Sequence, residues 1–167
     1  MTIHKLTLPL PDIGHLKLQP GDKILLSGTL YTARDMAHKR LVALINSEEP
    51  LPWDLSQGAI FYCGPSPVPK GKLCGAVGPT TSARMDPFTP LLLDHGRKVM
   101  LGKGERSPEI AAAIRAHGAL YIVAVGGISA LLVRHVTGFE PFLWTELGAE
   151  AVYKMEVVDF PCYVTIV

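Results

Sequence analysis

The segment GPTTSARMD, residues 78–86, concentrates groups that could bind an anion and act on it. A Gly-Pro turn precedes three consecutive hydroxyl residues, Thr80, Thr81 and Ser82, and these are followed by Arg84 and Asp86. Hydroxyl and backbone N–H groups donate hydrogen bonds, and a guanidinium binds a carboxylate through two parallel bonds. The segment therefore predicts an anion-binding loop, with turn and cap formation as the alternative role of the threonines.

Two further cations stand in similar glycine-containing segments, Arg34 in GTLYTARD and Lys103 in GKGERS. Arg34 falls at the predicted start of a helix, where the helix dipole disfavours a cation, and this indicates a purpose for the charge. Lys103 lies between two glycines, which allow the backbone to approach a ligand closely. The alternatives are structural ion pairs, of Arg34 with Asp35 and of Arg84 with Asp86.

The chemistry of the anion follows from what accompanies these cations. The two Gly-Lys pairs lack the following hydroxyl residue of a phosphate-binding P-loop, and no GxGxxG or GxSxG segment occurs. Two arginines and a lysine on separate loops suit a small molecule with more than one carboxylate, because charge-assisted bonds of this kind are strong. The sequence favours a dicarboxylate ligand.

The elements that must position these residues alternate between strands and helices. Apolar runs that end in glycine precede segments with helical spacing of apolar residues, which predicts an α/β fold with a largely parallel sheet. Loops at the carboxyl ends of such strands meet at one edge, where ligands bind. The expected strands are 22–28, 59–62, 98–102, 119–127, 151–157 and 162–167, and the expected helices are 32–46, 89–96, 107–118 and 128–138.

Bulk properties narrow the class of protein. The 167 residues suit one domain, 1–167, and a formal net charge of +1 gives no electrostatic reason for nucleic acid as a partner. No apolar run reaches the length of a membrane span and the N-terminus lacks the features of a signal peptide, so a cytoplasmic protein without membrane contact is expected.

The histidines and cysteines do not form a metal-binding pattern. Three widely spaced cysteines, Cys63, Cys74 and Cys162, contain no CxxC pair and are expected to be buried free thiols. His38 is expected to pack or cap, Gly126-Gly127 to form a tight turn, and Glu146 to be a surface acid or a partner of a site residue. No cofactor is expected to bind this chain.

The order of these segments resembles one known family. The segments GTLYTARDMAHKRL, GPTTSARMDPFTP, GKG, AVGGISALL and WTELGAEAVYKMEVVDFP resemble, from about residue 20 onward, the C-terminal domain or separate beta subunit of iron–sulfur-dependent (class I) fumarate hydratases. The L-tartrate dehydratase beta subunit is closely related. The resemblance implies a three-layer swivelling β/β/α domain, with a largely parallel sheet plus a smaller antiparallel one.

The resemblance also implies a hydro-lyase reaction, the reversible hydration of fumarate to L-malate in the tricarboxylic acid cycle. A [4Fe-4S] cluster bound by a cluster-bearing alpha subunit would act on the substrate, and two copies of each subunit would form a heterotetramer. Thr80 matches the base that takes a proton from the substrate, and Arg34, Arg84 and Lys103, with Thr81, match the substrate-binding groups. The alternatives are an L-tartrate dehydratase beta subunit and a non-catalytic anion-binding module.

Overall fold

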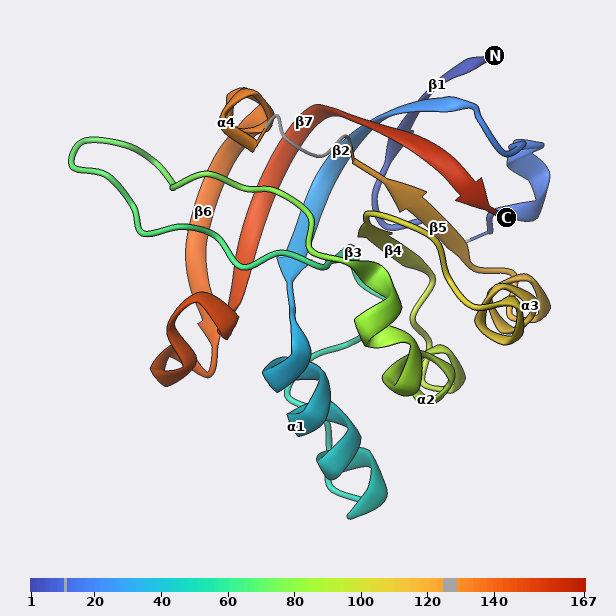
Figure 1. The fold of residues 1–167 in the computed structure, drawn as a ribbon, viewed down its shortest axis with the longest axis horizontal. Coiled ribbons are helices and arrows are strands. Elements are labelled where there is room, and N and C mark those ends of the chain that lie inside the picture. The colour runs from blue at the N-terminus through green and yellow to red at the C-terminus, as the bar shows by residue number, and fades with distance from the viewer. Residues whose placement is uncertain (11, 125–128) are drawn as a thin grey trace.

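The fold is a mixed α/β arrangement built on one seven-stranded sheet, with strand order β1-β2-β3-β4-β5-β7-β6 (Figure 1). The computed structural model describes residues 1–10, 12–124 and 129–167. The strands are β1 (Ile3–Thr7), β2 (Lys23–Thr32), β3 (Ala59–Phe61), β4 (Val99–Gly102), β5 (Leu120–Val123), β6 (Val136–Leu143) and β7 (Val152–Ile166). The helices are α1 (Asp35–Asn46), α2 (Thr89–Asp94), α3 (Pro108–Ala116) and α4 (Ser129–Leu132), with 3₁₀ helices at Gly14–Leu16, Ser82–Phe88, Val133–His135 and Thr145–Glu150.

The sheet closes on itself because its two longest strands pair with each other. Strands β2 to β5 are parallel neighbours, and β7 is antiparallel to both β5 and β2. The 15 residues of β7 allow its first part to pair with β6 and its last part to pair with β5. Gly28, at φ +119, breaks the register of β2 against β7, where the backbone of Leu8 leaves no room for a Cβ atom. The result is a barrel-like sheet with β1 and β6 at its margins.

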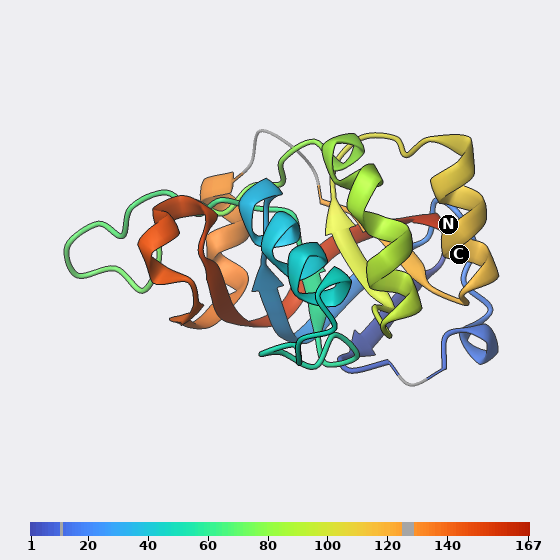
Figure 2. The ribbon, with the colours of Figure 1, turned by 90° about the horizontal axis from the view of Figure 1, so that it is seen from below.

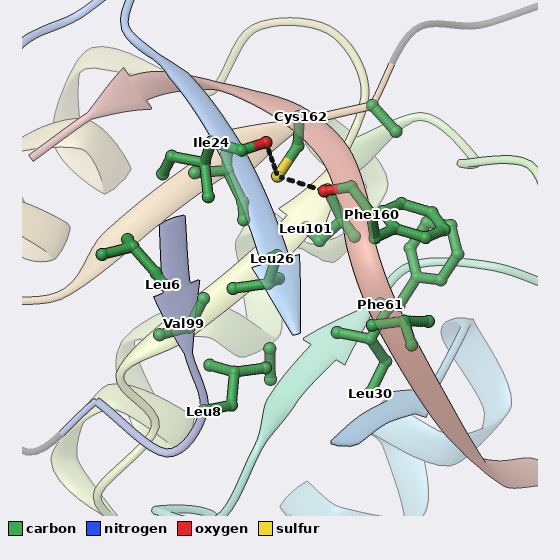
Figure 3. Packing of buried hydrophobic residues seen from close by; sticks show 14 of the residues in the cluster. Leu6, Leu8, Ile24, Leu26, Leu30, Phe61, Val99, Leu101, Phe160 and Cys162 are labelled. Atoms are coloured by element: carbon green, nitrogen blue, oxygen red, sulfur yellow. Dashed lines mark hydrogen bonds between the residues drawn. The ribbon is translucent and has the colours of Figure 1, made fainter. Parts of the chain in front are cut away.

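Alternating residues of the short parallel strands face two separate apolar clusters. In β4, Val99 and Leu101 belong to the cluster inside the barrel, whereas Met100 belongs to the cluster beneath the helices. This alternation follows from the two-residue period of a strand, and burial on both sides explains why these strands are apolar throughout. The interior cluster includes Phe61 and Phe160, whose rings pack edge to face with centroids 5.7 Å apart (Figure 3).

Helices α1, α2 and α3 lie together along one side of the sheet, and α4 lies apart from them beside β6 (Figures 1 and 2). Residues 64–78 form a long loop that projects away from the body in both views and returns to its starting point. A backbone bridge between Cys63 and Pro79 joins the two ends of this loop. No helix in the described part of the chain is long and apolar enough to span a membrane.

Several predicted elements are confirmed. Helix α3 begins after Ser107, whose side chain accepts a hydrogen bond from the Ile110 N–H, with Pro108 at its first position and Gly118 at φ +60 beyond its end. The expected strand 59–62 and the helix opened by Thr89 and Pro90 are also present. The three cysteines are buried free thiols, as expected.

Other predicted elements are wrong in extent. The two terminal strands expected at 151–157 and 162–167 are one continuous strand, because Asp159 at φ 51 bends β7 without ending it. Strand β2 runs past Gly28 to Thr32, so most of GTLYTARD is strand and not loop. Strand β1 was not predicted, and β6 begins at Val136, inside the segment 128–138 that was expected to be helical. The parallel and antiparallel pairings share one sheet, so the expected three-layer arrangement with two sheets is not confirmed. The expected tight turn at Gly126-Gly127 lies outside the described residues.

The interior cluster predicts that substitutions at two neighbouring positions of β7 differ greatly in their effect on stability. Phe160→Ala should lower the free energy of unfolding by about 3–5 kcal/mol, because a fully buried ring leaves a cavity. Val158→Ala, at a position that is 52% exposed, should change it by less than about 0.5 kcal/mol. Urea denaturation of both variants measures the difference, and similar losses at the two positions would contradict this description of the core.

Candidate active site

The loops after β3 and β4 meet at the carboxyl edge of the parallel strands, as expected. The Thr80 N–H donates to the Tyr62 carbonyl (2.7 Å), which joins the GPTTSARMD segment to the end of β3. Thr81 and Lys103 form a parallel backbone bridge, and the Ser82 N–H donates to the Lys103 carbonyl (3.0 Å). The sheet therefore places Thr80 and Thr81 beside the Lys103 backbone, although Lys103 lies more than 20 positions further along the sequence.

Arg84 lies beside the Thr80 hydroxyl and is oriented by a carboxylate of α1. Its Nη1 donates to Thr80 Oγ1 (3.5 Å) and its Nη2 donates to Asp35 Oδ1 (2.8 Å). The Arg84 side chain is 47% exposed, so one side of the guanidinium remains open to solvent. Asp35 thus pairs with Arg84 and brings the start of α1 to the same edge, in place of the Arg34–Asp35 and Arg84–Asp86 pairs considered from the sequence.

Arg34 directly precedes α1, at the positive end of the helix dipole, where a cation is expected to be unfavourable. Its carbonyl accepts bonds from the backbone N–H and the ring Nδ1 of His38 (3.1 and 2.8 Å). Glu150 accepts a bond from the Met36 N–H (3.3 Å), so an acid from the segment before β7 offsets the positive helix end. The Arg34 Nε is buried and has no hydrogen-bond partner among the described residues. An orphaned donor of this kind is costly, so this N–H is suited to donate a hydrogen bond to an oxygen atom of a ligand.

The two glycines around Lys103 have distinct structural reasons. A Cβ atom at Gly102 would collide with Ser82 Oγ and would lie 2.7 Å from a ring carbon of Tyr62. Gly104 has φ +81, a backbone conformation that L side chains rarely adopt. Room for Ser82 accounts for Gly102 and a left-handed turn accounts for Gly104, so neither glycine needs the close approach of a ligand that was expected from the sequence.

A buried ion pair holds the loops of the site together from below. The fully buried Arg106 side chain donates from Nε to Asp86 Oδ1 and from Nη2 to Thr89 Oγ1 (2.7 Å). Its guanidinium lies over the rings of Tyr62 and Tyr121, 5.3 and 4.9 Å from their centroids. The other oxygen of Asp86 accepts a bond from the Ser107 N–H (3.0 Å) at the start of α3. Asp86 is therefore a structural residue and leaves Arg84 free to pair with Asp35.

Sequence reasoning missed two residues that shape this site, Arg106 and Tyr121, and it considered a third, Asp35, only as a partner of Arg34. Arg106 was quoted within GKGERS, but an arginine just before a helix cap reads as a surface charge. Tyr121 is the one residue with a hydroxyl group in the otherwise apolar run ALYIVAV. A polar group in a buried strand needs a hydrogen-bond partner, and this was the signal in the sequence that could have identified Tyr121. Two roles were considered for Glu146, and the structure supports the first of them: it is a surface acid, paired with Arg40. His38 packs as expected, with its ring beside Tyr62 and Phe88 (centroids 5.5 and 5.7 Å).

The described residues do not fit an iron–sulfur cluster. Cysteine binds iron as a thiolate, and burial raises the pKa of Cys63 to about 12 and that of Cys162 well above its usual range. Burial also raises the pKa of Cys74. Within 1–10, 12–124 and 129–167, no three His, Cys, Asp or Glu side chains are grouped as metal ligands would be.

Comparison with known proteins identifies the family. A sequence model described as the fumarase C-terminus matches residues 12–167. The chain belongs to the fumarase C-terminus family. Among its relatives, fumarate hydratase 2 of Leishmania major is 38% identical over 148 residues, which are 87% of this chain. The anaerobic class I fumarate hydratase of Escherichia coli K12 is 38% identical over 86% of this chain.

Members of the family differ greatly in length. This chain spans only about a quarter of the two fumarate hydratases, 26% and 27% of their lengths. The beta subunit of L(+)-tartrate dehydratase from E. coli K12 is 36% identical over 93% of this chain and is covered over 78% of its own length. In size, this fumarase C-terminus chain thus corresponds to the named subunit and to a portion of the hydratases.

The ion pair beneath the site predicts a large effect of a single truncation. Asp86→Ala should lower the free energy of unfolding by about 3–5 kcal/mol, because it leaves the Arg106 charge buried without its carboxylate. Glu146→Ala removes the partner of Arg40 in an exposed pair and should cause no measurable change. Chemical denaturation compares the two, and a small loss in Asp86→Ala would show that Arg106 finds another partner or water. Asp86→Asn, which keeps an acceptor for the Ser107 N–H, provides a milder variant if the alanine variant does not fold.

His38 predicts a pH dependence of stability. Burial lowers the pKa of His38 from 6.5 to about 4, so the folded protein keeps this ring neutral while the unfolded chain protonates it below pH 6.5. Because the unfolded state then binds more protons, stability falls as the pH drops from 6.5 to about 4, by up to about 3 kcal/mol from this residue. His38→Asn keeps a side-chain donor at the Nδ1 position and should lose this contribution. Denaturation across that range measures it, and equal slopes in the two proteins would refute the assignment.

Proposed function

We propose that this chain is the beta subunit of a two-chain class I fumarate hydratase. In this role it supplies the proton-accepting hydroxyl, Thr80, and a substrate clamp formed by Arg34, Arg84, Lys103 and Thr81. A separate, cluster-bearing alpha subunit would carry the [4Fe-4S] cluster, since the described cysteines here do not fit one. The family and the names of its relatives support a hydro-lyase, and the tartrate dehydratase relative is itself named a beta subunit, which supports a division between two polypeptides.

The observation that carries the proposal is the contact between Arg84 Nη1 and Thr80 Oγ1. A threonine hydroxyl is a weak base in water, and a nearby positive charge favours its negatively charged form. Asp35 holds the other end of the guanidinium, so Arg84 reaches Thr80 in a fixed orientation. Backbone pairing of Thr81 with Lys103 brings in the backbone of a second cationic residue, which lies just beyond the end of β4.

These groups suit the breaking of a C–H bond beside a carboxylate. In the direction from malate to fumarate, Thr80 Oγ1 in its alkoxide form would accept the proton, and the electron pair left on carbon would spread into the adjacent carboxylate. That pair would then form the carbon–carbon double bond as the hydroxyl group leaves the neighbouring carbon. Lys103 and the two arginines would stabilise that growing charge more than the charge of the ground state, which is the requirement for catalysis. Arg34, with its buried Nε, suits a carboxylate oxygen at the start of α1.

The partner polypeptide is needed for a second reason, which is access of water. Arg84 is 47% exposed, and Thr81 and Lys103 are exposed as well. In water the cations are weakened by the high dielectric constant, so the site requires a covering surface before Thr80 becomes effective. A cluster-bearing subunit that docks on this edge would exclude water and complete the site, and a heterotetramer with two copies of each subunit is the proposed assembly.

L(+)-tartrate dehydration is the second candidate reaction. The tartrate dehydratase beta subunit matches this chain over most of both lengths, and the substrate is again a hydroxylated dicarboxylate that loses water. The segments RMDPFTP and VVDFP favour the fumarate reaction. A non-catalytic anion-binding module is the remaining alternative, and the presence of Thr80 beside Arg84 disfavours it, because anion binding alone needs no proton acceptor.

The proposal predicts that activity requires two polypeptides and Thr80. Under anaerobic conditions, this chain mixed with its reconstituted cluster-bearing partner should hydrate fumarate, and neither polypeptide alone should do so. Thr80→Ala should lower turnover in the mixture by about 100-fold to 10,000-fold, the usual contribution of a proton-transferring group, with little change in stability. The loss of fumarate absorbance and the formation of malate measure the rate.

Thr80→Ser is the matched control, since it keeps a hydroxyl at the same position and should retain part of the activity. Full activity in Thr80→Ala would refute the assignment of the base. A mixture that dehydrates L(+)-tartrate and leaves fumarate unchanged would transfer the same site to the second reaction. Binding of either dicarboxylate without turnover in any mixture would favour the non-catalytic module.

A further inference from the structure

The backbone that carries Lys103 is fixed by a buried chain of hydrogen bonds that the proposed function does not use directly. The Lys103 N–H donates to Ser82 Oγ (3.1 Å), and the Tyr121 hydroxyl lies 2.8 Å from Ser82 Oγ and 2.7 Å from the Gly104 carbonyl oxygen. Ser82 and Tyr121 are both completely buried. Together they contact the main chain on both sides of the Lys103–Gly104 peptide.

The direction of every bond in this chain follows from one carbonyl group. A carbonyl oxygen only accepts, so the Tyr121 hydroxyl uses its single proton on Gly104, and Ser82 must donate to the Tyr121 oxygen. Burial raises the pKa of Tyr121 to about 12, so the hydroxyl stays protonated at neutral pH. Ser82 Oγ then has a lone pair for the Lys103 N–H. Each hydroxyl therefore donates once and accepts once, and the bonds reinforce one another.

Tyr121 is held in place by contacts that do not involve Lys103. Its ring lies on β5 within the cluster beneath the helices, under the guanidinium of Arg106 at 4.9 Å from the centroid. The Lys103 carbonyl, which accepts the Ser82 N–H, gives this turn a further fixed point. Gly104, at φ +81, allows the chain to turn so that its carbonyl points down to Tyr121. A rigid ring thus supports an exposed turn whose only cationic side chain is Lys103.

We propose that Tyr121 is a positioning residue for Lys103, and that its hydroxyl fixes the turn at residues 102–104, and with it the backbone beside Thr81 from which the ammonium group projects. This inference rests on the proposed role of Lys103 as a carboxylate-binding group. The Tyr121 hydroxyl is buried beneath the turn and touches no substrate, so its effect on the reaction passes through the backbone of Lys103. Small displacements of a charged group in a site are enough to lower a rate strongly.

Tyr121→Phe tests the proposal because it removes the hydroxyl and keeps the ring under Arg106. In the mixture with the cluster-bearing partner, we expect kcat to fall by about 10-fold to 100-fold, with KM changed by less than about 3-fold. Amide hydrogen exchange of Lys103, measured by NMR on this chain, should become faster than in the wild type. Tyr31→Phe is the matched control: it removes the hydroxyl of another buried tyrosine in the same cluster, and this hydroxyl takes no part in the chain of bonds.

A double-mutant cycle separates positioning from a general structural effect. If Tyr121 acts through Lys103, Tyr121→Phe should have almost no further effect on kcat in a Lys103→Ala background, since the group that it positions is gone. Equal fold-losses in the two backgrounds, or unchanged exchange of the Lys103 amide, would overturn the inference while leaving the proposed function intact. A wild-type mixture that turns over neither substrate, or full activity in Lys103→Ala, would overturn the proposed role of Lys103 and this inference with it.

Discussion

The candidate site depends on one buried positive charge, the guanidinium of Arg106. This charge is fully removed from solvent and is compensated by Asp86, by the Thr89 hydroxyl and by the faces of two tyrosine rings. Because an uncompensated buried charge is very costly, the guanidinium fixes the position of each group around it. Those groups come from the end of β3, from the 3₁₀ helix Ser82–Phe88, from α2 and from β5, so one ion joins the segment that carries Thr80 and Arg84 to its neighbours.

The same constraint divides GPTTSARMD into two functional layers. Ser82 and Asp86 face inward, where their oxygen atoms are used by Lys103, Tyr121, Arg106 and Ser107. Thr80 and Arg84 face outward and contact each other at the edge of the sheet. The polar groups of this segment therefore serve both purposes: the outward pair presents a hydroxyl and a cation, and the inward pair holds the loop rigid from below.

The sequence allowed the prediction of elements whose signals are local. The cap of α3, the buried thiols and the convergence of Thr80, Thr81, Arg84 and Lys103 at a sheet edge follow from periodicity, turn residues and the rule for parallel strands. The closure of the sheet was not predictable in this way, because the pairing of β2 with β7 joins residues more than 100 positions apart. The partners of Asp35 and Asp86 were inaccessible for the same reason: each carboxylate had an arginine nearby in the sequence, and the fold supplied a different one.

Collecting three cations at one edge of a folded chain raises an electrostatic problem, and the placement of acids resolves it. Asp35 pairs with Arg84, and Glu150 caps the start of α1 beside Arg34, so the edge is partly neutralised without any ligand. Arg84 is 47% exposed, whereas the Asp35 side chain is 26% exposed, so an incoming carboxylate meets the guanidinium on its solvent side while Asp35 keeps its bond from behind. Because the orientation of Arg84 is already fixed, little side-chain entropy is lost when its guanidinium binds a carboxylate. The acids therefore stabilise the isolated chain and, by orienting Arg84, also suit the edge to the dicarboxylate proposed as its substrate.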